Sequence, residues 1–156
     1  MSFLRFLMLL ALVVWIGGII FFSFVVAPGL FMLLPKRELA GQVVTFALGG
    51  LHWIGIGAGV VFLICSLIHR RLAAGHTHFG LRETFIVLML ALTLVSQFAV
   101  TPRMRALRRD MVEIDTVAPS DPRRVEFNHL HRYSTELEGG VLALGLATLV
   151  CVSRRI

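Results

Sequence analysis

Four long apolar runs, separated by short polar segments, limit this chain more than any other feature. They cover about residues 3–26, 40–68, 84–100 and 139–153. Inside a bilayer every backbone N–H and C=O group needs a partner within the protein, so such runs cross the membrane as helices. About 20 residues cross a hydrocarbon core about 30 Å thick. The sequence therefore predicts an all-α fold, a four-transmembrane-helix bundle that forms a single integral membrane domain over residues 1–156.

Composition and charge agree with this class of protein. Hydrophobic residues make up 57% of the chain, against about 45–50% in soluble domains. The net charge of +6 would suit a nucleic-acid-binding protein. However, the basic residues lie at the ends of the apolar runs, where Lys and Arg mark membrane edges. We therefore expect a lipid bilayer, and no nucleic acid, as the partner. The run after Arg5 exceeds the roughly 7–15 apolar residues of a cleaved signal peptide, so we expect it to remain as the first span.

Prolines follow two of the apolar runs. Ala27-Pro28-Gly29 predicts a break or kink after the first span, because proline lacks a donor and clashes with the preceding turn. Pro102 follows the third run, and the residues after it have the spacing of an amphipathic surface helix. Asp121-Pro122 is a helix-start pattern, with Asp at the N-cap and Pro at the first position. We expect one helix of about 30 residues from Pro122 through the fourth span, so that region 101–138 is an amphipathic or loop region with partly extramembrane helices.

Small residues predict where the helices pack. Gly17 and Gly18 lie in the middle of the first span, and such residues let a neighbouring helix approach closely. Gly55 and Gly59 are four apart in the second span and so share one face. His52 lies on the same stripe. We expect this face to point into the bundle. There His52 either forms a hydrogen bond with a neighbouring backbone carbonyl or with Gln97, or binds a cofactor.

A second group of polar residues lies near the membrane boundary of the last span. Ser134 and Glu138 share one helical stripe with His131, whereas His129 lies off it. Gln97 interrupts the third span, and an unsatisfied amide is costly in lipid. We expect Ser134, Glu138 and Gln97 to form a polar cluster.

The cysteines and the loop histidines favour no metal site. Cys65 and Cys151 lie inside spans, without a CxxC or Cys/His pattern, which predicts buried thiols rather than zinc ligands or a disulfide. His76-Thr77-His78, with His69 nearby, is an H-x-H pair that could bind a metal. No acid or cysteine joins it, so we expect exposed loop histidines.

The orientation in the membrane follows from the basic residues. Four spans put both termini on one side, with Arg5, Arg70-Arg71, Arg82 and Arg154-Arg155. The other side has Lys36, Arg37 and seven Arg residues in the third loop, so the raw count slightly favours that loop as cytoplasmic. However, Arg5 and Arg70-Arg71 lie directly beside spans, and basic residues this close to a span usually determine its orientation, so they favour the side of the termini as cytoplasmic. We expect a multi-pass protein of a bacterial inner membrane with cytoplasmic termini.

Four short motifs resemble a known family. They are Trp15-x-Gly17-Gly18, Ala27-Pro28-x-Leu30-Phe31 with Pro35 and Ala40-Gly41, Pro102 with the Arg run, and Phe127-x-x-Leu130-His131-x-x-Ser134. Together they resemble a bacterial four-helix integral membrane family of unknown function that is related to eukaryotic transmembrane protein 205. The resemblance implies four spans and little about activity. Glu136 and Glu138 stand where relatives tend to carry a neutral polar residue.

A more distant likeness links the chain to haem-associated four-helix membrane proteins. These are the copper-resistance CopD type and the four-helix kind of protoporphyrinogen oxidase. They carry a histidine early in the first span, whereas the first span here has none.

Three functions remain open. The first is a non-enzymatic accessory subunit that packs against a larger respiratory, photosynthetic or other bioenergetic assembly, since no nucleophile–base set is present. The second is a redox protein that binds haem b or a chlorophyll-type pigment through His52 and either His131 or His129, because haem iron takes axial histidines. The third is a transporter of a small solute or metal, since Pro28 and Pro102 fall at matching places in the two halves.

Overall fold

The computed structural model describes residues 2–72, 80–111 and 114–153, and it confirms an all-α, four-helix membrane bundle. Four helical stretches are long and apolar enough to cross a membrane: Phe3–Leu33, Arg37–Leu72, Leu81–Met111 and Pro122–Ser153. In chain order the elements are α1 (Ser2–Phe21), a π-helical turn (Phe22–Val26), α2 (Ala27–Leu33), α3 (Arg37–Leu72), α4 (Leu81–Val95), a second π-helical turn (Ser96–Val100), α5 (Thr101–Met111), a 3-10 turn (Ile114–Thr116) and α6 (Pro122–Ser153).

The two prolines do not end their helices. Instead, a π-helical turn precedes each one, and the backbone N–H of Ala27 donates to the carbonyl of Phe22, five residues earlier. The N–H of Thr101 donates to the carbonyl of Ser96 in the same way. The wider turn keeps the backbone hydrogen-bonded where proline brings no donor of its own. The predicted break at residues 27–29 is therefore wrong, and the predicted continuation past Pro102 is confirmed.

The last helix begins where the sequence predicts. The backbone N–H of Arg123 donates to Oδ1 of Asp121 at 2.8 Å, which is the N-cap bond, and Pro122 is the first helical residue. Hydrogen bonds from Arg123 also lower the pKa of the Asp121 carboxyl to about 2. From here α6 continues without interruption to Ser153, so the expected long helix is confirmed.

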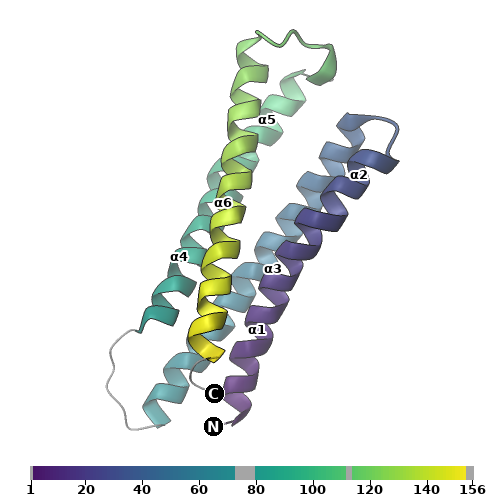
Figure 1. Ribbon diagram of the computed structural model, residues 1–156. Helices are drawn as coiled ribbons and strands as arrows, with labels where there is room; N and C mark the ends of the chain where they lie inside the picture. The colour runs from purple at the N-terminus through teal and green to yellow at the C-terminus, as the bar shows by residue number, and fades with distance from the viewer. Residues whose placement is uncertain (1, 73–79, 112–113, 154–156) are drawn as a thin grey trace.

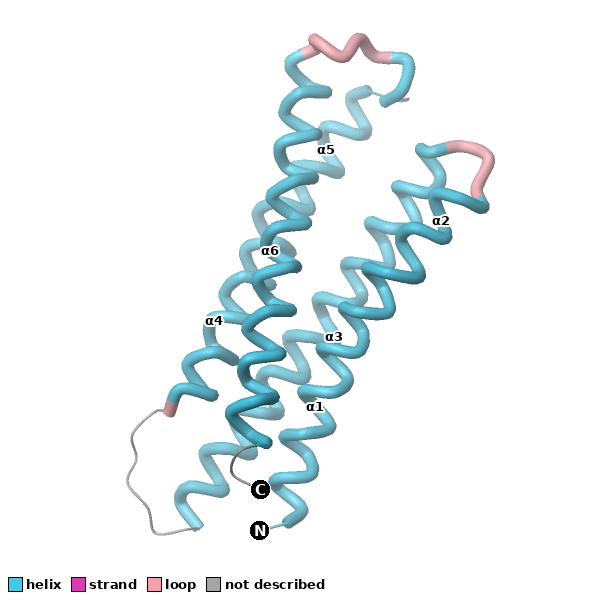
Figure 2. The backbone as a smooth tube through the Cα atoms, in the orientation of Figure 1, coloured by secondary structure: helices cyan, strands magenta, loops and turns pink. Residues whose placement is uncertain are grey.

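The bundle consists of two helical hairpins. α1 packs along α3, and α4 packs along α6, while α3 also contacts α4 and α1 contacts α6. Both chain ends lie at the same end of the bundle, which we call the terminal end (Figure 1). At the opposite end, which we call the loop end, the hairpin with α2 and the hairpin with α5 spread apart (Figure 2).

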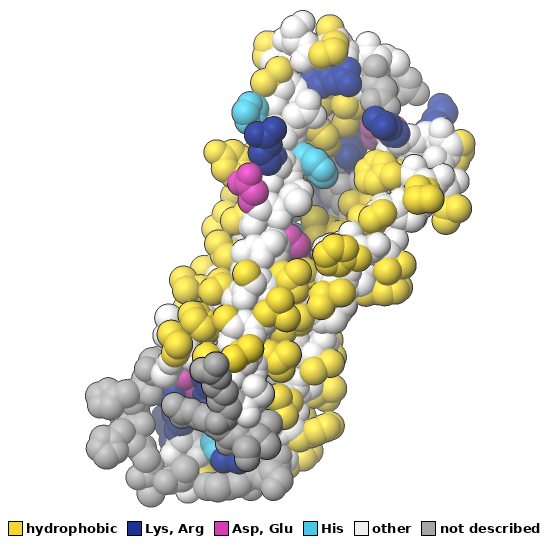
Figure 3. All heavy atoms as spheres, in the orientation of Figure 1, with side chains coloured by type: hydrophobic (Ala, Val, Ile, Leu, Met, Phe, Trp, Pro, Cys, Tyr) yellow, Lys and Arg dark blue, Asp and Glu magenta, His cyan; other side chains and the backbone are white. Residues whose placement is uncertain are grey.

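The buried core follows this shape. One apolar cluster fills the middle and the terminal end, with Trp15, Phe62 and Met89 among its largest members. A smaller cluster of Leu107, Met111 and Phe127 joins α5 to α6 at the loop end. α2 has no buried residue, so at this end the buried residues of the first hairpin belong to the start of α3, at Ala40 and Gly41. Hydrophobic side chains cover the outside of the bundle's middle, and Lys and Arg gather towards its two ends (Figure 3).

Glycines let the indole of Trp15 lie against α3. A Cβ atom at Gly55 would come within 2.4 Å of the Trp15 indole nitrogen, and one at Gly59 within 2.9 Å of its ring. A Cβ at Gly18 would meet Leu51 at 2.8 Å. Gly17 lies elsewhere: it is exposed, no atom stands within 4 Å of its Cβ position, and it packs against no other described helix. One residue along a helix is a rotation of about 100°, which separates the two neighbours.

We predict that Gly55→Leu lowers the melting temperature in detergent, because the new side chain overlaps Trp15. Overpacking of this kind costs about 1–3 kcal/mol. Gly57→Leu is the matched control, since no atom lies within 4 Å of a Cβ at Gly57 on the same helix. Equal melting temperatures for the two variants would contradict the packing role of Gly55.

Candidate functional site

The fold brings three polar side chains from different helices together in the middle of the bundle. His52 of α3 is only 1% exposed. Its Nδ1 lies 2.9 Å from Oε1 of Gln97, which belongs to the π-helical turn between α4 and α5. Its Nε2 lies 3.4 Å from Oε2 of Glu138 on α6. The predicted polar cluster thus contains Gln97 and Glu138 in contact through His52.

This contact constrains where protons can lie. An amide oxygen only accepts hydrogen bonds, so Nδ1 of His52 carries a proton and donates it to Gln97. Nε2 can bond Glu138 only when a second proton lies either on the imidazole or on the carboxyl group. His52 therefore links Gln97 to Glu138 through its two ring nitrogens.

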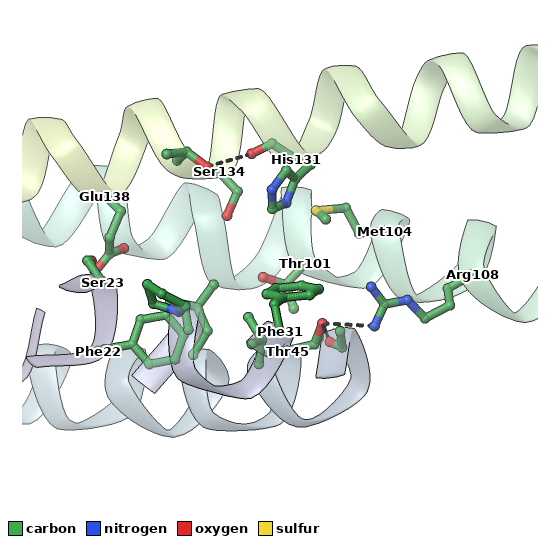
Figure 4. A pocket seen from close by; sticks show the side chains of 16 residues that line it. Phe22, Ser23, Phe31, Thr45, Thr101, Met104, Arg108, His131, Ser134 and Glu138 are labelled. Carbon is green, nitrogen blue, oxygen red and sulfur yellow. Dashed lines mark hydrogen bonds between the residues drawn. The ribbon is translucent and has the colours of Figure 1, made fainter. Parts of the chain in front are cut away.

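A cavity of about 350 Å³ lies next to these residues and opens at the loop end, between the two hairpins. Figure 4 shows that His131, Ser134 and Glu138 point into it from α6, opposite Phe22 and Phe31 of the first hairpin. Thr101, Met104 and Arg108 line a third side, and the surface is hollowed between α6 and α2 (Figure 3). The complete lining is Phe22, Ser23, Ala27, Pro28, Phe31, Gly41, Val44, Thr45, Leu48, Thr101, Met104, Arg108, His131, Ser134, Thr135 and Glu138.

The charged groups of the cavity lie at its two ends. Glu138 is 12% exposed and joins the cavity to the buried His52. At the outer end, the guanidinium of Arg108 lies over the ring of Phe127 at 5.3 Å from its centroid. The ring of His131 also stacks against Phe127, with ring centroids 6.5 Å apart and planes only 3° from parallel. The walls between the two ends are mainly apolar, so the cavity suits a molecule that has both an apolar and a polar part.

The three histidines that were considered as cofactor ligands fall in different places. His52 has both ring nitrogens in contact with other side chains. His131 lies two helical turns from Glu138, or about 10 Å along the helix axis, and it lines the cavity. His129 is exposed on α6 and does not line the cavity.

Several cavity residues were not predicted from the sequence. Ser23 and Phe22 come from the first π-helical turn, and Thr101 follows the second. A proline after a polar or small residue within a long apolar run is a sequence pattern that could have located these turns. Arg108 was predicted only as a residue of the membrane edge, because its spacing gives no indication that it turns into the bundle.

A second buried polar group lies at the terminal end. Glu83 is 2% exposed and accepts hydrogen bonds from Ser66 at 2.5 Å and from the backbone N–H of Gly80 at 3.0 Å. Arg70 and Arg82 each approach its carboxylate to 2.6 Å. This group ties the end of α3 to the start of α4. Glu83 stands three residues after the N-cap Gly80, a spacing that could have predicted it.

Metal ligands and cysteines add no further site in the described part of the chain. Within residues 2–72, 80–111 and 114–153, no three His, Cys, Asp or Glu side chains lie close enough to hold a metal. Cys65 is buried, Cys151 is half-buried, and both thiols are free. The His76-Thr77-His78 pair lies outside the described residues.

The fold and the site define the class of protein. A bundle of four helices that are each long and apolar enough to cross a membrane is a multi-pass integral membrane protein. The chain belongs to the family described as a domain of unknown function (DUF4149), whose model matches residues 10–113. No curated protein and no solved structure matches the chain.

The family match agrees with the expected resemblance to a family of unknown function. It gives no support to a relationship with transmembrane protein 205 or with the haem-associated proteins. The match includes His52 and Gln97 and ends before α6, which carries His131, Ser134 and Glu138. The cavity is thus built partly from the matched region and partly from the helix that follows it.

We predict that His52→Ala lowers thermal stability in detergent. The substitution leaves the Gln97 amide and the Glu138 carboxyl without their partner, and an unsatisfied buried polar group costs about 1–3 kcal/mol. His129→Ala is the control, because this residue is exposed on α6. If both variants melted like the wild type, the buried contact would have no energetic role.

Proposed function

We propose that this protein binds a small amphipathic molecule in the cavity between its two hairpins, at the loop end of the bundle. The cavity itself carries the proposal. Its volume of about 350 Å³ falls within the range of about 300–1,000 Å³ that is usual for ligand sites. Such sites are mostly apolar with a few polar groups that fix orientation, and this lining has the same character.

The position of the cavity supports a ligand that comes from the membrane. α2 has no buried residues, and Phe31 is 45% exposed beside the opening. The wall of the first hairpin contains a π-helical turn, a feature that recurs at functional sites. An ionisable group inside a membrane bundle is by default a candidate functional group, and Glu138 forms the inner end of this cavity.

A transporter of small solutes must also bind its solute, so the transport hypothesis is compatible with this proposal. The tetrapyrrole hypothesis has less support. His52 offers no free ring nitrogen, and His131 lies about two turns away along α6.

The accessory-subunit hypothesis is a second proposal, supported by a different surface. Trp53 and Phe98 are 57% and 60% exposed and form an edge-to-face pair with ring centroids 6.0 Å apart. An exposed aromatic pair suits a contact with another membrane subunit. This proposal requires comigration with a larger complex in mild detergent, and Trp53→Ala should weaken that association.

For the orientation, we propose cytoplasmic termini in a bacterial inner membrane. A fluorescent protein fused after Ile156 should then fluoresce, since it folds in the cytoplasm. Alkaline phosphatase inserted at Ser120, in the loop before α6, should be active, since it needs the periplasm. The opposite pair of results would contradict this orientation.

We predict that the protein purified in mild detergent carries a small molecule that native mass spectrometry detects as a mass adduct. Ser134→Phe should remove most of the adduct, because a phenyl group at this buried position fills the cavity. Asn128→Phe is the control, since Asn128 is exposed on α6 and does not line the cavity. Equal occupancy in both variants would contradict binding at this site.

A further inference from the structure

An open groove with arginine side chains lies beside the cavity, between α3 and α5. Its volume is about 620 Å³. α5 contributes Arg105, Arg108 and Arg109, and α3 contributes the facing wall. The residues of that wall are Glu38, Gln42, Thr45 and Phe46.

The groove has more positive than negative charge. Its three arginines and one glutamate leave a net charge of 3 − 1 = +2. In the described part of the chain, neither Arg105 nor Arg109 has a carboxylate partner. Glu38 approaches only Arg108, with Oε1 at 3.5 Å from Nε, and it also accepts a hydrogen bond from Gln42 at 3.3 Å. An anion would find unused donors here.

The Arg108 side chain is fixed by its contacts and still has a hydrogen-bond donor without an acceptor. Its Nη1 donates to Oγ1 of Thr45 at 3.3 Å, and the buried Nε has no hydrogen-bond acceptor. The guanidinium lies directly against Gly41, where a Cβ atom would stand 2.6 Å from Nη2. A planar guanidinium fixed in this way is suited to phosphate or carboxylate groups, which it binds through two parallel hydrogen bonds.

Arg108 and Thr45 line both the groove and the apolar cavity, so the two spaces meet at these side chains. The groove lies on α5, just after the apolar part of its span ends, where lipid headgroups are found. Phe46 on its wall is 81% exposed, as suits contact with lipid. One molecule could therefore place an anionic group against the arginines and an apolar chain in the cavity.

We infer that the ligand of the proposed cavity is an anionic amphiphile whose phosphate or carboxylate group is bound by Arg105, Arg108 and Arg109. This inference rests on the proposed function, because it names the chemical class of the molecule that the cavity binds. The arginines would recognise the same anionic group in a lipid headgroup and in free phosphate, so the test must distinguish these two sources.

The test compares dioctanoyl phosphatidate, dioctanoylglycerol and inorganic phosphate, each titrated onto the detergent-purified protein in native mass spectrometry. The two lipids have the same chains and differ in the phosphate. We expect phosphatidate to bind about 10- to 30-fold more tightly, because the net charge of +2 in the groove contributes about 1 kcal/mol, or roughly fivefold, per unit of charge. Inorganic phosphate should compete with phosphatidate for the groove, but it should bind more weakly than phosphatidate.

The double variant Arg105→Gln/Arg109→Gln should reduce phosphatidate binding to the level of dioctanoylglycerol, while it leaves Arg108 and its packing in place. Arg103→Gln/Arg132→Gln is the matched control. It removes the same charge, but Arg103 pairs with Glu126 outside the groove and Arg132 is exposed on α6. Full phosphatidate preference in the first variant would overturn the inference.

The remaining outcomes separate this inference from the proposed function. Equal binding of the two lipids by the wild type, blocked by Ser134→Phe, would overturn the anionic class and leave cavity binding intact. Phosphate that binds as tightly as phosphatidate would assign the groove to a free anion and overturn the claim that one molecule fills both spaces. Binding of neither lipid would contradict the proposed function itself.

Discussion

The need to satisfy every backbone hydrogen bond in lipid determines this architecture. It keeps the chain helical through two prolines that would end a helix in water, and it does so by a π-helical turn before each. The extra residue in such a turn shifts the phase of the helix, so α2 and α5 do not simply continue the buried faces of α1 and α4. Beyond these turns the hairpins spread apart (Figure 1), and there the cavity lies.

The same constraint applies to the polar side chains of the site, which need partners inside the bundle. The buried histidine and glutamate side chains of the bundle are paired: His52 contacts Gln97 and Glu138, and Glu83 is bonded at the terminal end. In the part of the chain that the structure describes, the buried hydroxyls of Thr93 and Ser96 have no hydrogen-bond partner. Arg108 lies beside the cavity, and its buried Nε has no hydrogen-bond acceptor among the described residues, although Glu38 approaches it to 3.5 Å. A bound anion would give this donor an acceptor. The amphipathic cavity and the charged groove beside it are two parts of one site in the proposed account.

Some of this could be predicted from the sequence. Hydropathy predicted four spans, and Asp121-Pro122 predicted the start of α6, because both depend on local chemistry. The stripe of His52 and the position of Gln97 predicted inward-facing side chains, with a backbone carbonyl or Gln97 as the partner of His52, and the structure has the contact with Gln97. The second contact of His52, with Glu138, was not predicted, because it depends on the packing of α3 against the second hairpin. The sequence pattern predicted a break or kink at Pro28, and the break is wrong because the π-helical turn depends on which hydrogen bonds the chain can rearrange. The inward turn of Arg108 over Phe127 depends on tertiary packing alone.

The proposed function requires that an amphipathic molecule occupies the space between the hairpins. The most direct test is photo-crosslinking in nanodiscs with a phosphatidate that carries a diazirine on its acyl chain, followed by peptide mapping. The account predicts labels on Phe22–Phe31 and His131–Glu138, which face each other across the cavity, and loss of these labels when unlabelled phosphatidate is added. Labels confined to the outer, lipid-facing residues of the spans, unchanged by competitor, would contradict it.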